Sequence, residues 1–311
     1  MKSWLASTLF IGCLSWSALA QAEIWQFGLI GDVPYTENER RELPRMLDHM
    51  AERKLAFIAH IGDFKSGRDR CDDSLFNDRY TLFNASQVPF IYVPGDNEWT
   101  DCDRTSSGSY DPLERLNALR KLFWKDAFSL GKQRLALEQQ PGIYKEHARF
   151  RIGPVLFVTV NLPGGSNNRG MRDEPSAEYL ARSPIVNNWI KENFSIARRD
   201  KLAGIVLLFQ ANPGFKYFAQ GIPNQAYKDF LEILKQETLS FDGKVAVVHG
   251  DTHRSRIDHP LRDAQGKRLE RFTRVETHGY PIMGWTRGTI DTDHPALFQF
   301  ESYNWSDFKA Q

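Results

Sequence analysis

Four runs of apolar, strand-forming residues in this chain each end at a Gly-Asp pair, and no other feature constrains the fold as strongly. The pairs place their aspartates at Asp32, Asp63, Asp96 and Asp251. Glycine lets the backbone turn sharply, and the residue after a buried strand lies at its carboxyl end, where open α/β sheets place their sites. We therefore expect four carboxylates at one sheet edge, where they would repel one another unless a metal ion lay between them. Four ordinary tight turns are the alternative, but they do not explain why each pair follows a buried strand.

The segments between these pairs carry apolar residues at helical spacing, which predicts alternating strands and helices. Residues 37–54 form the helix of a strand-helix-strand unit, so the first two strands should be parallel. Further helices are expected over about 75–83, 113–128, 184–199 and 224–236, and further strands over 155–160, 205–209, 272–277, 284–291 and 297–301. No repeat or linker interrupts the pattern, which therefore predicts one domain with two packed sheets and helices outside.

The first 22 residues have the composition of an export signal. Lys2 precedes an apolar stretch over 4–14, and small residues at Ala18, Ala20 and Ala22 supply a cleavage site. A membrane anchor is the alternative, but the apolar run is short for a bilayer span. We expect residues 1–22 to be a secretory signal peptide and residues 23–311 to be a single domain. The mature protein would be periplasmic or secreted and would carry no transmembrane segment.

Charge and cysteine content narrow the partners and the compartment. The formal net charge is +1 and long basic runs are missing, so the sequence shows no nucleic-acid patch and favours a small substrate. Cys13 would leave with the signal, so the mature chain would keep Cys71 and Cys102. An even pair in an oxidising compartment predicts one disulfide, with two free thiols as the alternative.

The order of the polar residues resembles the calcineurin-like metallophosphoesterase superfamily, which includes the purple acid phosphatases. The segments that carry the resemblance are Asp32-Val33-Pro34, Gly62-Asp63, Gly95-Asp96-Asn97-Glu98, Gln210 after a strand, and Gly250-Asp251-Thr252-His253. The resemblance covers about residues 24–255. It implies an α/β fold, a four-layer αββα sandwich of two mixed sheets flanked by helices, with the motifs on loops at the strand ends.

Several residues depart from the family's motifs. The replacements are Pro34 for a ligand histidine, Asp96 for a ligand asparagine, Asn97 for the histidine that usually protonates the leaving group, Gln210 for a histidine after a strand, and Asp251 for the first histidine of the last motif. His253 keeps the second histidine of that motif. The chain is thus a divergent relative that gains carboxylates where the family has other ligands.

Carried over by position, the resemblance implies two divalent metal ions. The first ion would be held by Asp32, Asp63 and His253. The second would be held by Asp63, Asp96, Asp251 and the amide oxygen of Gln210. Because the second set is all oxygen, it suits Mn²⁺, Mg²⁺ or Ca²⁺ better than zinc or iron.

The resemblance also implies an exported phosphoesterase that hydrolyses a small phosphate mono- or diester by a metal-bound hydroxide. We predict Asn97, Asp63 and His253 as catalytic residues, and Asn97 and Arg169 as substrate-binding residues. An amide cannot donate the proton that a leaving group needs, so His60, His249 or the loop around Arg169 would have to compensate.

Two alternatives remain open at this point. The first is a weak or inactive pseudoenzyme that binds a phosphate-containing ligand or a protein partner without turnover, which the lost histidines favour. The second is a hydrolase that uses two carboxylates without metal, as glycosidases do. That second alternative explains neither the four Gly-Asp pairs nor His253.

Overall fold

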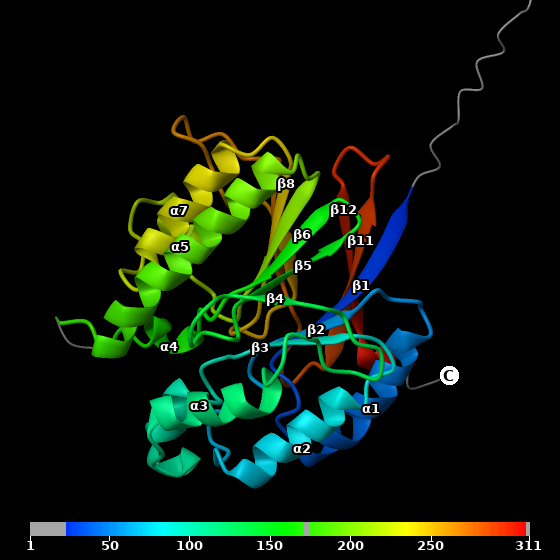
Figure 1. Cartoon of the computed structure of the whole chain (residues 1–311), viewed down its shortest axis with the longest axis vertical. Helices are drawn as coiled ribbons and strands as arrows, with labels where there is room; N and C mark the ends of the chain where they lie inside the picture. The colour runs from blue at the N-terminus through cyan, green and yellow to red at the C-terminus, as the bar shows by residue number, and fades with distance from the viewer. Residues whose placement is uncertain (1–22, 171–173, 309–311) are drawn as a thin grey trace, which may run out of the picture.

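Two mixed β-sheets packed face to face form the centre of the protein (Figure 1). The computed structural model describes residues 23–170 and 174–308, so the predicted signal peptide lies outside the described residues. The first sheet has the order β12-β11-β1-β2-β3. Its strands are β1 (Ile24–Ile30), β2 (Ile58–Ile61), β3 (Phe90–Val93), β11 (Gly284–Asp291) and β12 (Phe298–Asn304). β1, β2 and β3 run parallel, as the strand-helix-strand pattern predicts, and β11 and β12 add antiparallel strands.

The second sheet has the order β4-β5-β6-β7-β8-β10-β9. Its strands are β4 (Glu138–Gln139), β5 (Ala148–Ile152), β6 (Val155–Thr159), β7 (Gly204–Leu208), β8 (Lys244–His249), β9 (Arg256–Asp258) and β10 (Phe272–Glu276). β6, β7, β8 and β10 are parallel, and the remaining strands are antiparallel. The parallel strands are buried on both faces, which explains their uninterrupted apolar sequences.

Helices cover the outer faces of both sheets and complete four layers. One buried cluster joins the first sheet to α1 (Glu37–Ala51), α2 (Asp73–Asn84) and α3 (Pro112–Phe123). Another joins the second sheet to α5 (Ala177–Arg199) and α7 (Lys228–Leu239). The shorter helices are α4 (Gly164–Asn167), α6 (Phe215–Ala219) and three 3₁₀ turns, at Thr100–Asp103, Thr105–Ser107 and Trp305–Phe308. The αββα sandwich implied by the sequence is confirmed.

Aromatic side chains fill the space between the two sheets. Phe27 of β1 and Phe57, the residue before β2, pack edge-on against Phe157 of the second sheet, with ring centroids 5.1 and 4.9 Å away. Phe150 stacks on Phe157 from the neighbouring strand. Each fully buried ring stabilises the fold by roughly 1.5 to 3 kcal/mol, so this cluster fixes how the two sheets sit on each other.

Two expected helix boundaries are wrong. The helix expected over 184–199 begins at Ala177, where the Ser176 side chain accepts the backbone N–H of Tyr179 and caps the helix. Pro184 therefore lies inside the helix. The helix expected over 113–128 ends at Phe123, because the chain beyond it joins the edge of the first sheet through paired backbone hydrogen bonds between Phe90 and Leu130.

The Gly-Asp pairs do not all lie on one sheet edge, and this part of the expectation is also wrong. Asp32, Asp63 and Asp96 follow β1, β2 and β3 of the first sheet, whereas Asp251 follows β8 of the second. The sheets pack so that these strand ends meet: the backbone N–H of Asp251 donates to the Asp32 carboxylate. In the described ranges, 23–170 and 174–308, none of the helices combines the length and the apolar character that crossing a membrane requires.

Candidate active site

The four aspartates of the Gly-Asp pairs meet at the joined ends of the two sheets. Asp251 N–H lies 3.1 and 3.2 Å from the two carboxylate oxygens of Asp32. A side-chain carbon added to Gly164 would lie 2.6 Å from Asp96 Oδ1 and 2.7 Å from Asp251 Oδ1. Asp63 lies between these groups and accepts the backbone N–H of Asn97 at 3.1 Å. The structure therefore brings together the four carboxylates that the sequence singled out. This group of Asp32, Asp63, Asp96 and Asp251 is called the acidic centre.

The backbone at these positions is in a rarely populated conformation. Asp32, Asp63, Asp251 and His253 have φ values of 53°, 57°, 78° and 58°. The left-handed region costs a residue other than glycine about 1 to 2 kcal/mol, and aspartate is among the residues that tolerate it best. Such strain persists where the surrounding structure imposes it, and it concentrates at functional sites. Here it turns each side chain into the space between the sheets' ends.

Asp32 and His253 form one pair of facing groups, called here the Asp32–His253 pair. His253 Nε2 lies 3.5 Å from Asp32 Oδ1, and His253 Nδ1 donates to the carbonyl of Tyr280 at 2.7 Å. Burial raises the pKa of Asp32 to about 6, although His253 opposes the shift. The hydrogen-bonded Asp32 in turn raises the pKa of His253. Each partner thus stabilises the charged form of the other.

Asp96 and Asp251 form a second pair, called here the Asp96–Asp251 pair, in which both groups are acids. Asp96 Oδ1 is buried and accepts no hydrogen bond, whereas Asp251 Oδ2 accepts the backbone N–H of Asn212 at 2.8 Å. Burial and the nearby charge of Asp251 raise the pKa of Asp96 well above its usual range. An unpaired buried carboxylate oxygen beside a second carboxylate is costly, and a bound cation would remove that cost.

Asp63 lies between the two pairs, and hydrogen-bond donors occupy both of its oxygens. Oδ1 accepts the N–H of Asn97, and Oδ2 accepts Gln210 Nε2 at 3.1 Å and the Tyr35 hydroxyl at 3.3 Å. Burial, followed by the charge of Asp96, raises the pKa of Asp63 well above its usual range. Asp63 is therefore the carboxylate that links the two halves of the centre.

The hydrogen bonds of Gln210 define how its amide is turned. Its Oε1 accepts the backbone N–H of Gly164, which can only donate, so its Nε2 must be the atom that faces Asp63. The predicted metal ligand of Gln210, the amide oxygen, thus lies against Gly164 in this structure. Its role as a ligand stays a prediction.

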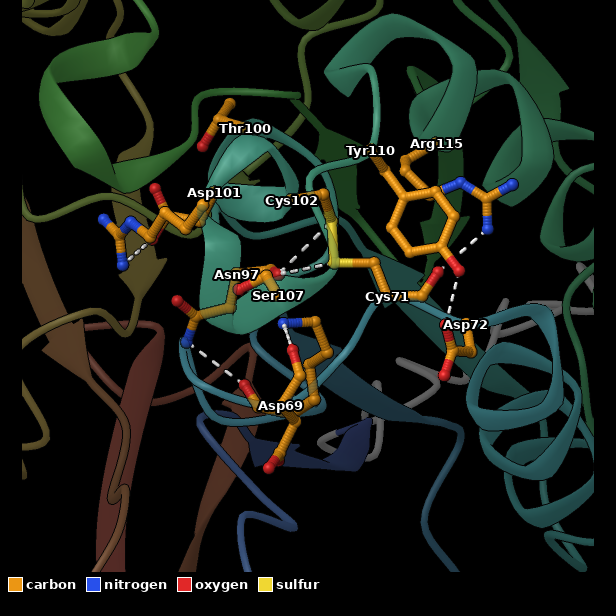
Figure 2. The surroundings of a disulfide bond; sticks show 12 residues. Asp69, Cys71, Asp72, Asn97, Thr100, Asp101, Cys102, Ser107, Tyr110 and Arg115 are labelled. Atoms are coloured by element: carbon orange, nitrogen blue, oxygen red, sulfur yellow. Dashed lines mark hydrogen bonds and ion pairs between the residues drawn. A yellow bond between two sulfur atoms is a disulfide. The ribbon is translucent and has the colours of Figure 1, made fainter.

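Asn97 is braced on three sides. Its Nδ2 donates to the carbonyl of Lys65 and to the Tyr35 hydroxyl, both at 3.1 Å. Its backbone carbonyl lies 3.7 and 3.8 Å from the sulfurs of Cys71 and Cys102, as Figure 2 shows. Both amide hydrogens are therefore used inside the protein, which leaves none for a substrate oxygen.

The predicted disulfide between Cys71 and Cys102 is confirmed (Figure 2). It joins the loop after β2 to the loop after β3, with a Cα–Cα distance of 5.8 Å. Because these two loops carry Asp63 and Asp96, the disulfide holds both sides of the acidic centre in one covalent unit.

One ring nitrogen of His60 and one of His249 face backbone carbonyl groups. His60 Nε2 lies 2.6 Å from the carbonyl of Val33, and His249 Nδ1 lies 3.0 Å from that of Gly250. Burial lowers the pKa of His60 to about 4 and that of His249 to about 3. Both rings pack against buried aromatic side chains, so their surroundings are those of core residues rather than proton donors.

Arg169 follows a left-handed turn that lies against Asp96. Gly165, Ser166, Asn167 and Asn168 all have φ between 54° and 57°, and a side-chain carbon on Gly165 would lie 3.3 Å from Asp96 Oδ2. Buried Arg182 holds the turn by donating to the side chain and the carbonyl of Asn167. The residue of this turn that lies against Asp96 is Gly165, four positions before Arg169, and the binding role of Arg169 stays a prediction.

Two further site residues were missed from the sequence. Glu98 Oε1 accepts the N–H groups of Asp63 and Gly95 and the hydroxyl of Tyr92, which ties the second and third strand ends together. Tyr35 contacts Asp63 from a position only three residues after Asp32. Its closeness in sequence to the first aspartate was the available signal, since the loop after a strand end carries the site.

The side chains that could bind divalent cations lie in two pairs, with Asp63 between them, rather than in one cluster. The pairs are Asp32 with His253 and Asp96 with Asp251. Among residues 23–170 and 174–308, no three or more His, Cys, Asp or Glu side chains are grouped closely enough to hold a metal as they stand. The unpaired Asp96 Oδ1 beside Asp251 is nevertheless an oxygen site for a hard cation. The hydrogen bond of His253 also fits a metal-binding imidazole. Such a ring usually donates the N–H that does not face the metal to a carbonyl or carboxylate, as Nδ1 does here.

The fold of this chain is similar to the folds of several solved proteins. No protein-family model and no curated protein matches the sequence. Among solved structures, a dimetal phosphatase from Danio rerio is 13% identical over 90% of this chain and 99% of its own, with a TM-score of 0.52. A purple acid phosphatase from yellow lupin (Lupinus luteus) seeds is 12% identical over 92% of this chain, with a TM-score of 0.55, and the match spans 52% of its own length.

A third solved structure with a similar fold is described by a different role. GAP50, described as the anchor in the inner membrane complex of Plasmodium, is 12% identical over 90% of this chain and 84% of its own, with a TM-score of 0.54. At such identities these likenesses establish the fold and leave the activity open. The chain has the fold of the calcineurin-like metallophosphoesterases, on which its four Gly-Asp aspartates occupy the strand ends.

Proposed function

We propose that this protein hydrolyses a small phosphate mono- or diester with the help of divalent cations. The observation that carries the proposal is the meeting of Asp32, Asp63, Asp96 and Asp251 from two sheets at one point of this fold. Four buried carboxylates without cations would destabilise the protein, so their convergence supports a cation-binding role. The fold shared with a dimetal phosphatase and a purple acid phosphatase supports phosphate esters as substrates.

Two groups of residues would hold the cations. Asp32, Asp63 and His253 form the first group, and Asp63, Asp96 and Asp251 form the second. When bound, such ions lower the pKa of a water and neutralise phosphate oxygens. The excess of carboxylates favours Mn²⁺, Mg²⁺ or Ca²⁺.

The chain's own cationic side chains would hold the phosphate. Arg169 is one candidate. Arg104 is another, because one of its guanidinium nitrogens and Asn97 Oδ1 both lie within 3.2 Å of the point that a side-chain carbon on Gly67 would occupy. Arg104 is half-exposed and pairs with Asp101 at 2.7 Å, so it can reach an incoming anion. A planar guanidinium suits two phosphate oxygens at once.

A non-catalytic role is the second candidate. The observation that favours it is the engagement of Asp63, whose two oxygens already accept three hydrogen bonds from the protein. The Plasmodium protein with this fold is described as an anchor, and this description supports a binding role. In that case the chain would bind a phosphate-containing ligand or a partner without turnover.

Elemental analysis combined with turnover separates the two candidates. The purified protein would be loaded with Mn²⁺, Mg²⁺ or Ca²⁺, and p-nitrophenyl phosphate and bis(p-nitrophenyl) phosphate would be supplied. We expect up to two ions per chain and turnover of at least one ester. A protein that holds its ions and turns over neither ester would support the binding role instead.

Export is part of the proposal. The disulfide supports it, because such bonds persist in oxidising compartments, and so does the composition of the first 22 residues. Expression of the full chain in bacteria followed by fractionation would test it. A protein found only in the cytoplasm, with Cys71 and Cys102 as free thiols, would contradict it.

A further inference from the structure

The hydroxyl of Tyr35 lies where three functional side chains of the candidate site meet. Its oxygen is 3.1 Å from Asn97 Nδ2, 3.3 Å from Asp63 Oδ2 and 3.4 Å from His253 Nε2. The side chain is half-buried. Asn97 stands where related enzymes keep a proton-donating histidine, and Tyr35 is the group that this asparagine contacts.

The hydrogen bonds around Asn97 determine which group gives a proton to which. Its Nδ2 carries two hydrogens, and one goes to the carbonyl of Lys65, which can only accept. The other goes to the oxygen of Tyr35. Tyr35 therefore accepts from Asn97 and keeps its own proton for an acceptor on another side.

The acceptors inside the protein already have other partners. Asp63 Oδ2, the nearest one, also accepts Gln210 Nε2 at 3.1 Å. His253 faces Asp32 through Nε2 and donates through Nδ1 to the backbone. A substrate oxygen that entered the site could take the Tyr35 proton without leaving either group unpaired.

The ring of Tyr35 is held in place by neighbouring aromatic groups. It stacks on Tyr280 with a centroid distance of 5.9 Å and meets His253 edge-on at 5.3 Å. These contacts fix the direction of the hydroxyl, which a proton donor needs.

We propose that Tyr35 is a catalytic residue that donates its phenolic proton to the leaving oxygen of the substrate, in place of the histidine that this chain lacks at Asn97. The inference rests on the proposed phosphoesterase function. In the step, the oxygen of a water forms a bond to phosphorus while the bond from phosphorus to the leaving oxygen breaks. The electron pair of the broken bond stays on the leaving oxygen, which takes the proton of Tyr35. The proton released by the attacking water returns to Tyr35 through solvent.

Two monoesters of equal charge and similar size test the assignment. Benzyl phosphate releases an alkoxide that needs a proton, whereas p-nitrophenyl phosphate releases a stable phenolate. Tyr35→Phe should lower kcat/KM for the benzyl ester by about 10²- to 10⁴-fold, the usual contribution of a general acid. It should lower kcat/KM for the p-nitrophenyl ester by less than about fivefold. For a diesterase, the corresponding methyl diesters replace these monoesters.

Controls separate proton donation from a structural role. Tyr217→Phe removes a hydroxyl from an exposed tyrosine of α6 and should change neither ester's kcat/KM. Tyr35→Phe should keep its cation content by elemental analysis, its melting temperature and its affinity for inorganic phosphate. The double variant Tyr35→Phe/Asn97→His should recover turnover of the benzyl ester, because the new imidazole can supply the proton.

Each outcome decides the assignment. Equal losses for both esters, or no loss for either, would overturn it while leaving the phosphoesterase function in place. Failure of the double variant to gain on the benzyl ester, when its melting temperature shows that it is folded, would also count against it. If the cation-loaded wild type turns over no ester at all, the phosphoesterase function fails and the assignment fails with it.

Discussion

The two pairs of side chains in the acidic centre differ in how their charge is balanced. In the Asp32–His253 pair, an imidazole lies 3.5 Å from the carboxylate, and both carboxylate oxygens also accept a backbone N–H. In the Asp96–Asp251 pair, two carboxylates face each other and one buried oxygen of Asp96 has no hydrogen-bond partner. The chain itself offsets part of the charge of the first pair, whereas nothing in the described residues pairs with that buried oxygen of the second, where we propose a cation.

This difference has a consequence for stability and for metal binding. The charge of His253 offsets part of the cost of burying Asp32, whose pKa rises only to about 6. Two buried carboxylates without a counter-ion destabilise the folded protein, and the destabilisation is released when a cation binds. At neutral pH the folded protein thus carries a cost that a bound cation would remove.

Removal of the carboxylate between the pairs should have the largest effect. Asp63→Asn should lower turnover roughly 10³-fold, since Asp63 belongs to both groups of proposed cation ligands. Elemental analysis should show the loss of at least one ion per chain. Asp242→Asn, an exposed aspartate, is the matched control and should change neither value. An Asp63→Asn protein that keeps two ions would show that the two pairs bind cations independently of Asp63.

Removal of the disulfide should disturb the Asp96–Asp251 pair more than the Asp32–His253 pair. Cys71→Ser/Cys102→Ser should lower the free energy of unfolding by about 2 to 4 kcal/mol, mainly because the unfolded chain is no longer constrained. Both sulfurs also contact Asn97, the residue after Asp96. Equilibrium unfolding in denaturant would measure the loss, and titration with Mn²⁺ would show whether affinity falls. Unchanged stability would contradict the prediction, as would free thiols in the oxidised wild-type protein.

Single amide substitutions should shift the free energy of unfolding by different amounts at the two pairs. In the presence of EDTA, Asp96→Asn should raise the free energy of unfolding by about 1 to 3 kcal/mol, because it removes a buried charge without a partner. Asp32→Asn should raise it by less, because His253 already offsets part of the cost of burying the Asp32 charge. Thermal unfolding in EDTA and in Mn²⁺ would measure both. Shifts of equal size would mean that the pairs do not differ in charge balance.

The free energy of unfolding without metal should also depend on pH. This effect should be smaller than those above, but it should still distinguish the two pairs. The pKa of Asp96 is raised in the folded protein, so its carboxylate destabilises the fold at neutral pH and this cost disappears as pH falls through the folded pKa. The difference in the free energy of unfolding between wild type and Asp96→Asn should therefore become smaller from pH 8 to pH 5.

The contribution of His253 to stability changes with pH because of a stabilising rather than a destabilising charge. Asp32 raises the pKa of His253, so the stabilisation is complete below the unfolded value of about 6.5 and is lost as pH rises through the folded pKa. The advantage of wild type over His253→Gln should accordingly shrink by about 1 kcal/mol or less above neutral pH. Melting temperatures in EDTA across this range would measure both differences. A difference that stays constant with pH would contradict the corresponding charge assignment.

Much of the fold could be predicted because its signals are local. The apolar runs that end in Gly-Asp correspond to β1, β2, β3 and β8, and the helical spacing over 37–54 corresponds to α1. The short antiparallel strands β4, β5 and β9 were not predicted, because their residues alternate or are partly exposed and lack a continuous apolar run. Helix ends were misjudged where a cap or a sheet edge, rather than a proline or an apolar stripe, set the boundary.

The sequence by itself determined which carboxylates this protein brings to its strand ends, and which two cysteines join the loops beside them. Only the tertiary structure decided how those groups are paired. Asp251 arrives from the second sheet, Gln210 turns its Nε2 toward a residue 147 positions away, and Tyr35 meets a histidine 218 positions away. A strand and its corner follow from neighbouring residues, whereas the partner of a buried polar group depends on how distant segments pack, which no local pattern encodes.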